Sequence, residues 1–366
     1  MESLFYLSFS LADGIGPKTF ELLLKKFGTA EKAWESSVNE LKDAGLGPKT
    51  IDALNLFRNT YNPKEYIQKL EKNKIWYISQ NDKEYPESLK KLPNPPIVVF
   101  GRGDKSCLSS PKTIGVVGAR KVTSYGREVT EGLVADLVSY GFTIISGMAL
   151  GVDAIAHIAC LENNGATIAV LGNGVDLPFP RENQSLYQNI IEQGSAIISE
   201  YPPGTNPSKG SFPARNRIIA ALSDGILITE AAEDSGSLIT ADWSLKLNKK
   251  VFAVPGPITS RMSDGTSRLL KQGAVLVQNT QDILNEFSLQ FPSGQASSNK
   301  SKKINYKKMG LAKDEIKILK LLENEEMVID EISKRVNYSV PVIMQILGVM
   351  EIKGIIGNIN GRYRVI

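Results

Sequence analysis

The stretch Ile114-Gly-Val-Val-Gly118 opens a series of short apolar runs that decides the fold of this chain. Helical stretches alternate with these runs, for example at residues 126–140 and 153–162. Continuous apolar runs are typical of strands covered on both faces, and their alternation with helices indicates parallel pairing. The sequence therefore predicts an α/β fold with a doubly wound, mostly parallel, extended Rossmann-like sheet. Its expected strands are residues 114–118, 142–146, 167–171, 196–199, 225–229, 251–254 and 274–277.

The first segment, residues 1–70, is predicted to be a small helical domain with an internal repeat. Leu11-Ala-Asp-Gly-Ile-Gly-Pro-Lys-Thr19 recurs as Lys42-Asp-Ala-Gly-Leu-Gly-Pro-Lys-Thr50. Gly-x-Gly permits a tight turn that exposes backbone N–H groups, and the Pro and Lys after it suit a helix start that faces an anion. The repeat is typical of paired helix-hairpin-helix motifs, although a simple Gly-Pro helix break gives the same pattern. The candidate contacts to a duplex backbone are Gly14, Gly16, Lys18, Gly45, Gly47 and Lys49.

Three further segments complete the predicted organisation. Residues 71–287 form the Rossmann-like core, and residues 288–309 form a flexible basic linker, because they are rich in polar residues and lysine. Residues 310–366 are predicted to form a winged helix, with helices followed by a Gly-turned hairpin. Its third helix, residues 340–353, has almost no cations. We therefore expect this helix to contact protein or to have an auxiliary role, rather than to read a DNA sequence.

The composition excludes several classes of site. Cys107, Cys160 and the single histidine, His157, are too few for a structural zinc site of the Cys/His kind or for a disulfide framework. The formal net charge of +4 permits a polyanionic partner without requiring one. A signal peptide is not visible, and no apolar run approaches the roughly 18 residues of a membrane span. We expect a cytoplasmic protein without membrane contact, metal or cofactor.

The loop Lys209-Gly-Ser-Phe-Pro-Ala-Arg-Asn-Arg217 places three cations around one aromatic residue. Cations attract phosphates, and the face of Phe212 can stack on an unpaired base without reading its sequence. The loop therefore indicates a site for single-stranded nucleic acid, with Lys209, Arg215 and Arg217 as phosphate contacts. The alternative is a basic surface loop whose Phe212 plugs the core beneath it.

Other loops that follow the expected strands complete the candidate site. In doubly wound sheets, ligands bind at the carboxyl ends of the strands, near the switch in strand order. Gly118-Ala-Arg-Lys121 and Ser235-Gly-Ser237 stand at such ends, and the second loop opens a helix whose free N–H groups suit an anion. The Walker pattern is absent, and Leu177 stands where a dinucleotide fingerprint needs its third glycine.

Residues suited to catalysis form no recognisable set. Ser146 has no second histidine beside a carboxylate in any familiar order, and His157 is expected to cap or pack its helix. Asp153, Glu200 and Glu230 could supply carboxylates for acid–base work. We expect them instead to cap helices or to pair with arginines.

Seven ordered stretches of the core carry a family resemblance: Val116-Val-Gly-Ala-Arg120, Ser146-Gly-Met-Ala-Leu-Gly-Val-Asp153, Ala169-Val-Leu-Gly-Asn-Gly-Val-Asp176, Ile198-Ser-Glu-Tyr-Pro202, Phe212-Pro-Ala-Arg-Asn-Arg-Ile-Ile-Ala220, Ser235-Gly-Ser-Leu-Ile-Thr-Ala241 and Phe252-Ala-Val-Pro-Gly256. They resemble the DNA-processing protein family called DprA or Smf. The match runs from about Lys83 to Val277, and both ends fit the family's usual helical and winged-helix additions. The resemblance implies a protein without catalytic turnover that binds single-stranded DNA, forms homodimers and helps to load the RecA recombinase in natural transformation.

The resemblance also implies which residues form the site. In the family, a Gly-Ser/Thr-Arg loop and a Phe-x-x-Arg-Asn loop form the strand-binding pocket. Ala119 replaces the usual hydroxyl residue here, and we expect its backbone amide to remain available to a phosphate. The expected site is Gly118, Arg120, Lys209, Phe212, Arg215, Asn216, Arg217, Ser235, Gly236 and Ser237.

Two other interpretations remain open at this point. The first is an enzyme, a nucleotide N-glycoside hydrolase, because such enzymes resemble this sheet. They carry a Pro-Gly-Gly-x-Gly-Thr stretch that leads to a glutamate, and residues 229–237 lack it. The second is a scaffold that recruits partners through its winged helix and dimer surface while the sheet binds nothing.

Overall fold

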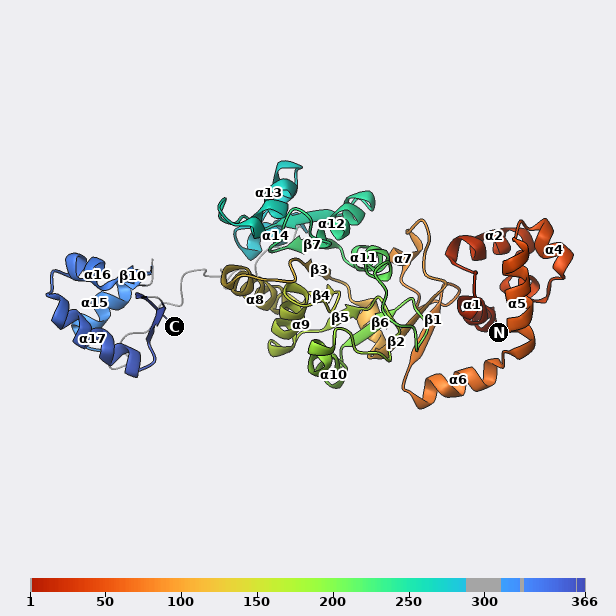
Figure 1. Ribbon diagram of the computed structural model, residues 1–366, viewed down its shortest axis with the longest axis horizontal. Coiled ribbons are helices and arrows are strands. Elements are labelled where there is room, and N and C mark those ends of the chain that lie inside the picture. Colours follow the sequence, from red (N-terminus) through yellow and green to blue (C-terminus); the bar gives the residue numbers. More distant parts are fainter. Residues whose placement is uncertain (1, 288–310, 323–325, 360, 366) are drawn as a thin grey trace. The chain divides into compact units, whose positions relative to one another are not determined.

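A computed structural model describes residues 2–287, 311–322, 326–359 and 361–365 (Figure 1). The chain divides into two compact units, Met1–Leu289 and Gln290–Ile366. Each unit has its own cluster of buried hydrophobic side chains. The linker predicted at residues 288–309 lies outside the described residues.

A large mixed sheet forms the centre of the first unit. Its strands are β1 (Trp76–Ser79), β2 (Val98–Gly103), β3 (Thr113–Val117), β4 (Thr143–Ser146), β5 (Thr167–Val170), β6 (Ala196–Ser199), β7 (Gly225–Ile228), β8 (Lys250–Ala253) and β9 (Val275–Leu276). Within the described residues, they follow the order β1-β2-β6-β5-β4-β3-β7-β8-β9. Strands β3 to β9 pair in parallel, whereas β2 is antiparallel to both β1 and β6. The prediction of a doubly wound, mostly parallel sheet is confirmed.

The antiparallel edge, β1 and β2, is not predicted by the pattern of apolar runs. The ring of Trp76 lies over Gly101 of the neighbouring strand, where a Cβ atom would stand 2.2 Å from it. The indole Nε1 of Trp76 also donates a hydrogen bond of 2.9 Å to the carbonyl of Gly103. Glycine weakens the strand signal of a sequence, and here the close packing of an indole on the backbone compensates for it.

Helices cover both faces of the sheet (Figure 1). Helices α8 (Ser124–Ser139), α9 (Val152–Glu162) and α10 (Gln184–Glu192) lie on one face, and α11 (Ser211–Leu222) and α12 (Ser237–Lys246) on the other. The direction of the strand order reverses between β3 and β7, and such a switch leaves a crevice at the carboxyl ends of the strands. The shorter elements are α7 (Glu87–Lys90), α13 (Asp264–Lys271), α14 (Thr280–Glu286), η1 (Lys105–Ser109), η2 (Arg181–Asn183) and η3 (Arg261–Ser263).

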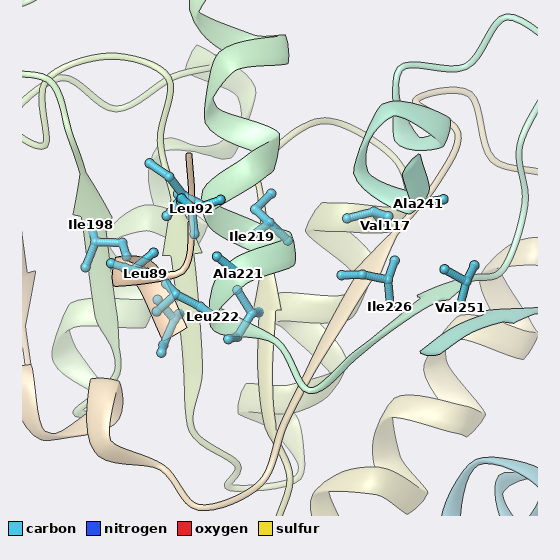
Figure 2. Close-up of a cluster of buried hydrophobic side chains, with 14 of the residues drawn as sticks. Leu89, Leu92, Val117, Ile198, Ile219, Ala221, Leu222, Ile226, Ala241 and Val251 are labelled. Atoms are coloured by element: carbon cyan, nitrogen blue, oxygen red, sulfur yellow. The ribbon is translucent and has the colours of Figure 1, made fainter. Parts of the chain in front are cut away.

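Buried apolar side chains anchor α11, the helix that bears Phe212. Its residues Ile219 and Leu222 lie with Leu89 and Leu92 in one cluster, close to Ile198 of β6 (Figure 2). Farther along the same core lie Val117, Ile226, Ala241 and Val251 of β3, β7, α12 and β8. Because interiors are closely packed, this core fixes the position of the helix start that faces the crevice.

The helices of residues 2–72 form a second core that includes the sheet edge. They are α1 (Glu2–Leu11), α2 (Pro17–Phe27), α3 (Ala30–Glu35), α4 (Val38–Asp43), α5 (Pro48–Thr60) and α6 (Pro63–Lys72). Their buried side chains pack against Val98 and Phe100 of β2. These N-terminal helices therefore rest directly on the Rossmann-like sheet within the first compact unit, and a separate helical domain at residues 1–70 stays a prediction.

The two copies of the internal repeat form matching turns before α2 and α5. Gly14 and Gly45 have φ angles of +81° and +90°, which only glycine adopts without strain. The side chain of Thr50 stands 3.3 Å from the place of a Cβ on Gly14, and that of Leu22 stands 3.7 Å from the place of a Cβ on Gly45. Each turn thus packs beside the helix that follows the other turn, and the assignment as helix-hairpin-helix motifs stays a prediction.

The second unit is small and mixed. It contains helices α15 (Lys313–Leu322), α16 (Ile329–Val336) and α17 (Val340–Ile352) and strands β10 (Met327–Val328), β11 (Ile356–Ile359) and β12 (Arg362–Val365). The described strands form an antiparallel sheet of order β10-β12-β11. Val342, Met344 and Val349 of α17 are exposed. The winged-helix assignment stays a prediction.

Candidate nucleic-acid interface

A cavity of about 550 Å³ lies at the carboxyl ends of β3 and β7, where the strand order switches. Loops far apart in the sequence meet there, because parallel strands end at the same edge of the sheet. The structure brings nine of the ten predicted site residues to its lining: Gly118, Arg120, Lys209, Phe212, Arg215, Asn216, Ser235, Gly236 and Ser237.

Phe212 stands in the first turn of α11 and borders the cavity with a half-buried ring. Its ring stacks on that of Phe179, with 5.5 Å between ring centroids and 26° between ring planes. A Cβ on Gly172 would lie 3.0 Å from Cδ1 of Phe212, so glycine at position 172 leaves room for the ring. This position does not support the alternative in which Phe212 plugs the core.

Arg120 and Lys209 are the exposed cations of this group, and both line the cavity. Among the described residues, neither takes part in a salt bridge. The exposed Lys121 also lines the cavity, as do the carboxylates of the buried Asp153 and the exposed Asp234. Cations without acidic partners favour an anionic ligand at this end of the cavity.

Arg215 lines the cavity but is only 5% exposed. Its Nη1 donates to the carbonyl of Gly147 at 2.6 Å and to that of Val170. Burial lowers the pKa of Arg215 to about 10, the charge of Asp153 opposes that shift, and the charge of Arg120 adds to it. The guanidinium therefore binds backbone carbonyls beneath the cavity. The sequence predicts Arg215 as a free phosphate contact, and the structure corrects this: its main contacts are inside the protein.

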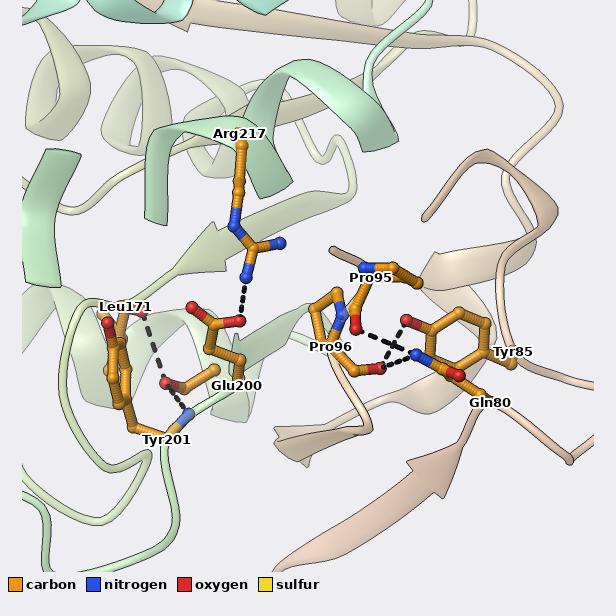
Figure 3. Close-up of polar contacts among 9 residues, drawn as sticks. Gln80, Tyr85, Pro95, Pro96, Leu171, Glu200, Tyr201 and Arg217 are labelled. Carbon is orange, nitrogen blue, oxygen red and sulfur yellow. Dashed lines mark hydrogen bonds and ion pairs between the residues drawn. The ribbon is translucent and has the colours of Figure 1, made fainter. Parts of the chain in front are cut away.

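Arg217 requires a clearer correction, because it is the predicted site residue that does not line the cavity. Its Nη2 forms an ion pair with Oε2 of Glu200, and both side chains are 12% exposed. Figure 3 shows the guanidinium directed at that carboxylate. The sequence places the two cations of Arg215 and Arg217 two positions apart, which on a helix directs them to different sides. Arg217 serves the interior rather than a phosphate.

Ala119 also departs from expectation. Its backbone N–H donates to the carbonyl of Glu230 at 2.8 Å, so the amide is not free for a phosphate. Gly118 faces the same carbonyl, since a Cβ there would stand 2.6 Å from the Glu230 oxygen. The loop after β3 is thus held tightly against the loop after β7, and Arg120 projects from a fixed base.

Asn216 links α11 to the start of α12. Its Nδ2 donates to the carbonyl of Gly236 at 3.1 Å, and its Oδ1 accepts from Nε of Arg215 at 3.1 Å. The hydroxyls of Ser235 and Ser237 lie 2.8 Å apart beside this turn. Asn216 therefore positions a helix start whose backbone N–H groups suit an anion.

Of the three carboxylates expected to cap helices or to pair with arginines, Glu200 forms an ion pair with Arg217, whereas Glu230 and Asp153 accept hydrogen bonds from loop and N-cap residues. Glu230 accepts hydrogen bonds from the backbone and hydroxyl of Thr123, the N-cap of α8. Asp153 accepts from the backbone of Gly147 at 3.0 Å, and burial raises its pKa while Arg215 opposes that shift. Glu200 is the partner of Arg217.

His157 and Ser146 are both buried and engaged. Nδ1 of His157 lies 2.7 Å from Oγ1 of Thr167, and burial lowers the pKa of this imidazole to about 3. Ser146 donates to the carbonyl of Val116 at 2.6 Å. The histidine packs its helix, as the sequence predicts. In the described part of the chain, no group of His, Cys, Asp and Glu is arranged to hold a metal ion.

The six residues predicted to touch a duplex backbone lie apart from the cavity lining: the four glycines stand in the turns before α2 and α5, and Lys18 and Lys49 stand in the first turns of these helices. Gly16 and Gly47 are the N-caps of these helices, with Pro17 and Pro48 at the first helical positions. Their contact with DNA stays a prediction. Within the described residues, no helix is both long and apolar enough to cross a membrane.

Phe179 is a feature of this site that the sequence motifs did not indicate. It follows β5 in the stretch Leu177-Pro-Phe-Pro180, and the residue is 37% exposed. An exposed aromatic residue between two prolines is the signal that could have drawn attention to it. Its contact with Phe212 becomes visible only when the loops are folded together.

The sheet order and the cationic, aromatic crevice at its switch point define a Rossmann-like protein suited to a polyanionic ligand. Residues 76–288 match the family described as DNA recombination-mediator protein A. The chain is 37% identical over 287 residues to the protein Smf of Synechocystis, which covers 77% of this chain and 72% of that protein. It is 42% identical over 203 residues to DprA of Streptococcus pneumoniae, covering 56% of this chain and 71% of that protein.

Solved structures agree with these sequence relatives. The X-ray structure of DprA from Streptococcus pneumoniae has a TM-score of 0.69 and 32% identity, covering 79% of this chain and 98% of that chain. A structure of DNA processing protein A from Helicobacter pylori, described for its single-stranded DNA binding mode, has a TM-score of 0.53 and 34% identity, covering 59% and 97%. The chain belongs to the DprA/Smf family of DNA-processing proteins.

Proposed function

We propose that this protein binds single-stranded DNA in the crevice at the carboxyl ends of β3 and β7. The observation that supports the proposal most is the half-buried ring of Phe212, which shares one cavity with the exposed cations Arg120 and Lys209. A ring stacks on any base and a cation attracts any phosphate, so such a site holds a strand without reading its sequence. The relative from Helicobacter pylori, whose structure concerns single-stranded DNA, supports the same assignment.

Each residue has a distinct role in this proposal. Arg120 and Lys209 neutralise phosphates, and Phe212 stacks on a base. Asn216 holds the start of α12, so that the backbone around Gly236 and the neighbouring serine hydroxyls face the strand. Arg215 supports the floor beneath them.

The family membership extends the proposal to the whole protein. We infer a recombination mediator that acts without catalytic turnover, protects incoming single strands and helps to load RecA in transformation and recombination. It would act as a homodimer in the cytoplasm. The proposed division is a helical domain at 1–70, the core at 71–287, a basic linker at 288–309 and a winged helix at 310–366.

The helical domain is proposed to contribute at most a weak duplex contact. Residues 1–70 contain nine Lys or Arg and nine Asp or Glu, so the domain has no net charge to attract a polyanion. Any contact would come from the backbone of the two turns and from Lys18 and Lys49. The apolar surface of α17 favours a protein partner for the winged helix.

Binding of labelled oligothymidylate to the full-length protein tests the pocket. Phe212→Ala should weaken binding by about 1–3 kcal/mol, roughly 5- to 150-fold, because one stacked base is lost. Arg120→Ala should weaken binding, and it should reduce the magnitude of the slope of log affinity against log salt concentration by about 0.7, because one phosphate contact is lost. Lys25→Ala, on the exposed side of α2, serves as the control. Unchanged binding in both pocket variants would contradict the assignment.

A second assay tests the absence of turnover. We expect the purified protein to leave nucleoside monophosphates intact. Release of the free base, lost in a pocket variant, would revive the hydrolase interpretation.

A further inference from the structure

The loop between β5 and η2 holds an aromatic ring at the border of the proposed strand site. Phe179 is 37% exposed and stacks on Phe212, with ring centroids 5.5 Å apart. It does not line the cavity that contains Phe212, so the ring pair extends the aromatic surface beyond that cavity.

The loop holds this ring in a fixed position. Prolines on both sides restrict the backbone at Phe179. Asn173 Nδ2 donates to the carbonyl of Leu177 at 2.7 Å, and Asn183 Nδ2 donates to that of Met148 at 2.8 Å. Both asparagine side chains are buried, and they anchor the loop on either side of the ring. An aromatic surface that is already ordered loses little entropy when a ligand stacks on it.

The charge next to the ring also suits a strand. Arg181 is exposed, and none of the salt bridges among the described residues involves it. Glu182 beside it is exposed too and partly offsets this charge. The nearest upstream acid, Asp176, is engaged by the backbone N–H of Gly204 at 2.8 Å.

We propose that Phe179 is a second stacking surface for an unpaired base, so that the Phe179–Phe212 pair holds two bases of one strand. This inference rests on the proposed function. A base stacks on a ring at a separation of about 3.5–4 Å, so a base between two rings needs about twice that distance between the rings. The two ring centroids are only 5.5 Å apart, so a base cannot enter between them. The second base must therefore lie on the side of Phe179 that faces away from Phe212. The strand has to span the ring pair, which makes the contact at Phe179 dependent on oligonucleotide length.

A double-mutant cycle on the full-length protein separates this role from simple support of Phe212. Phe179→Leu keeps apolar volume and removes the aromatic face, Phe179→Tyr keeps the face, and Phe212→Leu removes the first surface. With an oligothymidylate of about 16 nucleotides, Phe179→Leu should weaken binding roughly five-fold or more, and the losses in the double variant should multiply. With about 4 nucleotides, Phe179→Leu should have no effect, and Phe179→Tyr should bind both lengths normally.

Two patterns would overturn the proposal. In the first pattern, Phe179→Leu weakens the binding of both lengths equally and has no effect in the Phe212→Leu background, which is the behaviour of a residue that only positions Phe212. Alternatively, Phe179→Leu could bind normally while Phe212→Leu fails, which removes this inference and leaves the proposed function standing. If Phe212→Leu and Arg120→Ala both bind normally, the proposed function itself fails.

A spectroscopic measurement adds a readout that does not depend on affinity. A single 2-aminopurine, moved along the longer oligonucleotide, should change its fluorescence at two separated positions when bound to the wild-type protein. Phe179→Leu should restore free fluorescence at one of them. The proposal of a second stacking surface would be contradicted by a fluorescence change at only one position with the wild-type protein. It would also be contradicted if Phe179→Leu abolished the change at both positions.

Discussion

Arg120 and Arg215 line the same cavity, yet the structure predicts opposite consequences when each is replaced. Arg120 is exposed and takes part in no salt bridge of the described residues, whereas Arg215 is 5% exposed and donates to the carbonyls of Gly147 and Val170. Arg120→Ala should therefore change DNA binding with little effect on folding. Arg215→Met should change folding first.

The magnitudes follow from burial. Substitution of an exposed side chain away from special features changes stability by about 0.5 kcal/mol or less. Removal of Arg215 leaves the buried Asp153 without the positive charge that opposes the rise of its pKa, and it leaves two carbonyls without their donor. A buried polar group that loses its hydrogen-bond partner costs about 1–3 kcal/mol, so we expect Arg215→Met to lower the free energy of unfolding by several kcal/mol. The double variant Asp153→Asn with Arg215→Met should recover part of that loss, because the stranded carboxylate is then gone.

Urea unfolding and salt-dependent binding of oligothymidylate measure the two effects separately. Arg120→Ala should keep the unfolding midpoint and lower the salt slope by about 0.7. Arg215→Met should lower the midpoint, and at temperatures where it remains folded its salt slope should stay close to that of the wild type. A stable Arg215→Met variant with the flattened slope would refute this division of roles.

Three further outcomes follow from the same geometry. Burial lowers the pKa of His157 from 6.5 to about 3. Below pH 6.5 the unfolded chain therefore binds a proton that the folded chain does not, and stability falls by up to about 1.4 kcal/mol per pH unit down to pH 3. Urea unfolding across this range should show a smaller loss for His157→Asn, and an equal loss would mean that the imidazole is not buried neutral. Arg217→Met leaves the buried Glu200 without its partner, so the free energy of unfolding should fall by about 3–5 kcal/mol while the salt slope of binding stays unchanged. A flattened salt slope would instead support the prediction from sequence that Arg217 contacts a phosphate. Lys18→Ala with Lys49→Ala should leave single-strand affinity unchanged in gel-shift titration, and a large loss would move the site to the helical domain.

The sequence predicts the crevice well because its loops follow strands of one parallel sheet. Short apolar runs identify β3 and β7, and the carboxyl ends of parallel strands meet at one edge. Arg120, Phe212 and Ser235 are therefore expected together although they are far apart in the chain. The side chains need no special contacts for this prediction, since the topology alone brings them to one place.

The sequence does not predict which cations are already occupied. Arg215 and Arg217 lie two positions apart in the same basic stretch of α11. Only the folded chain brings the carbonyl of Gly147 to Arg215 and the carboxylate of Glu200 to Arg217. The amide of Ala119 is likewise taken by the carbonyl of Glu230 from another loop. Partners that come from distant segments leave no mark in a local pattern.

The proposed function requires that an unpaired strand lies on Phe212 in the cavity that Arg120 and Lys209 also line. Photocrosslinking of the full-length protein to oligothymidylate that contains 4-thiothymidine, followed by peptide mass spectrometry, tests it most directly. We predict crosslinks at Phe212 and in its immediate surroundings, lost when excess unlabelled single strand is added. Crosslinks confined to residues 13–19 and 44–50, or to residues 311–365, would contradict the claim.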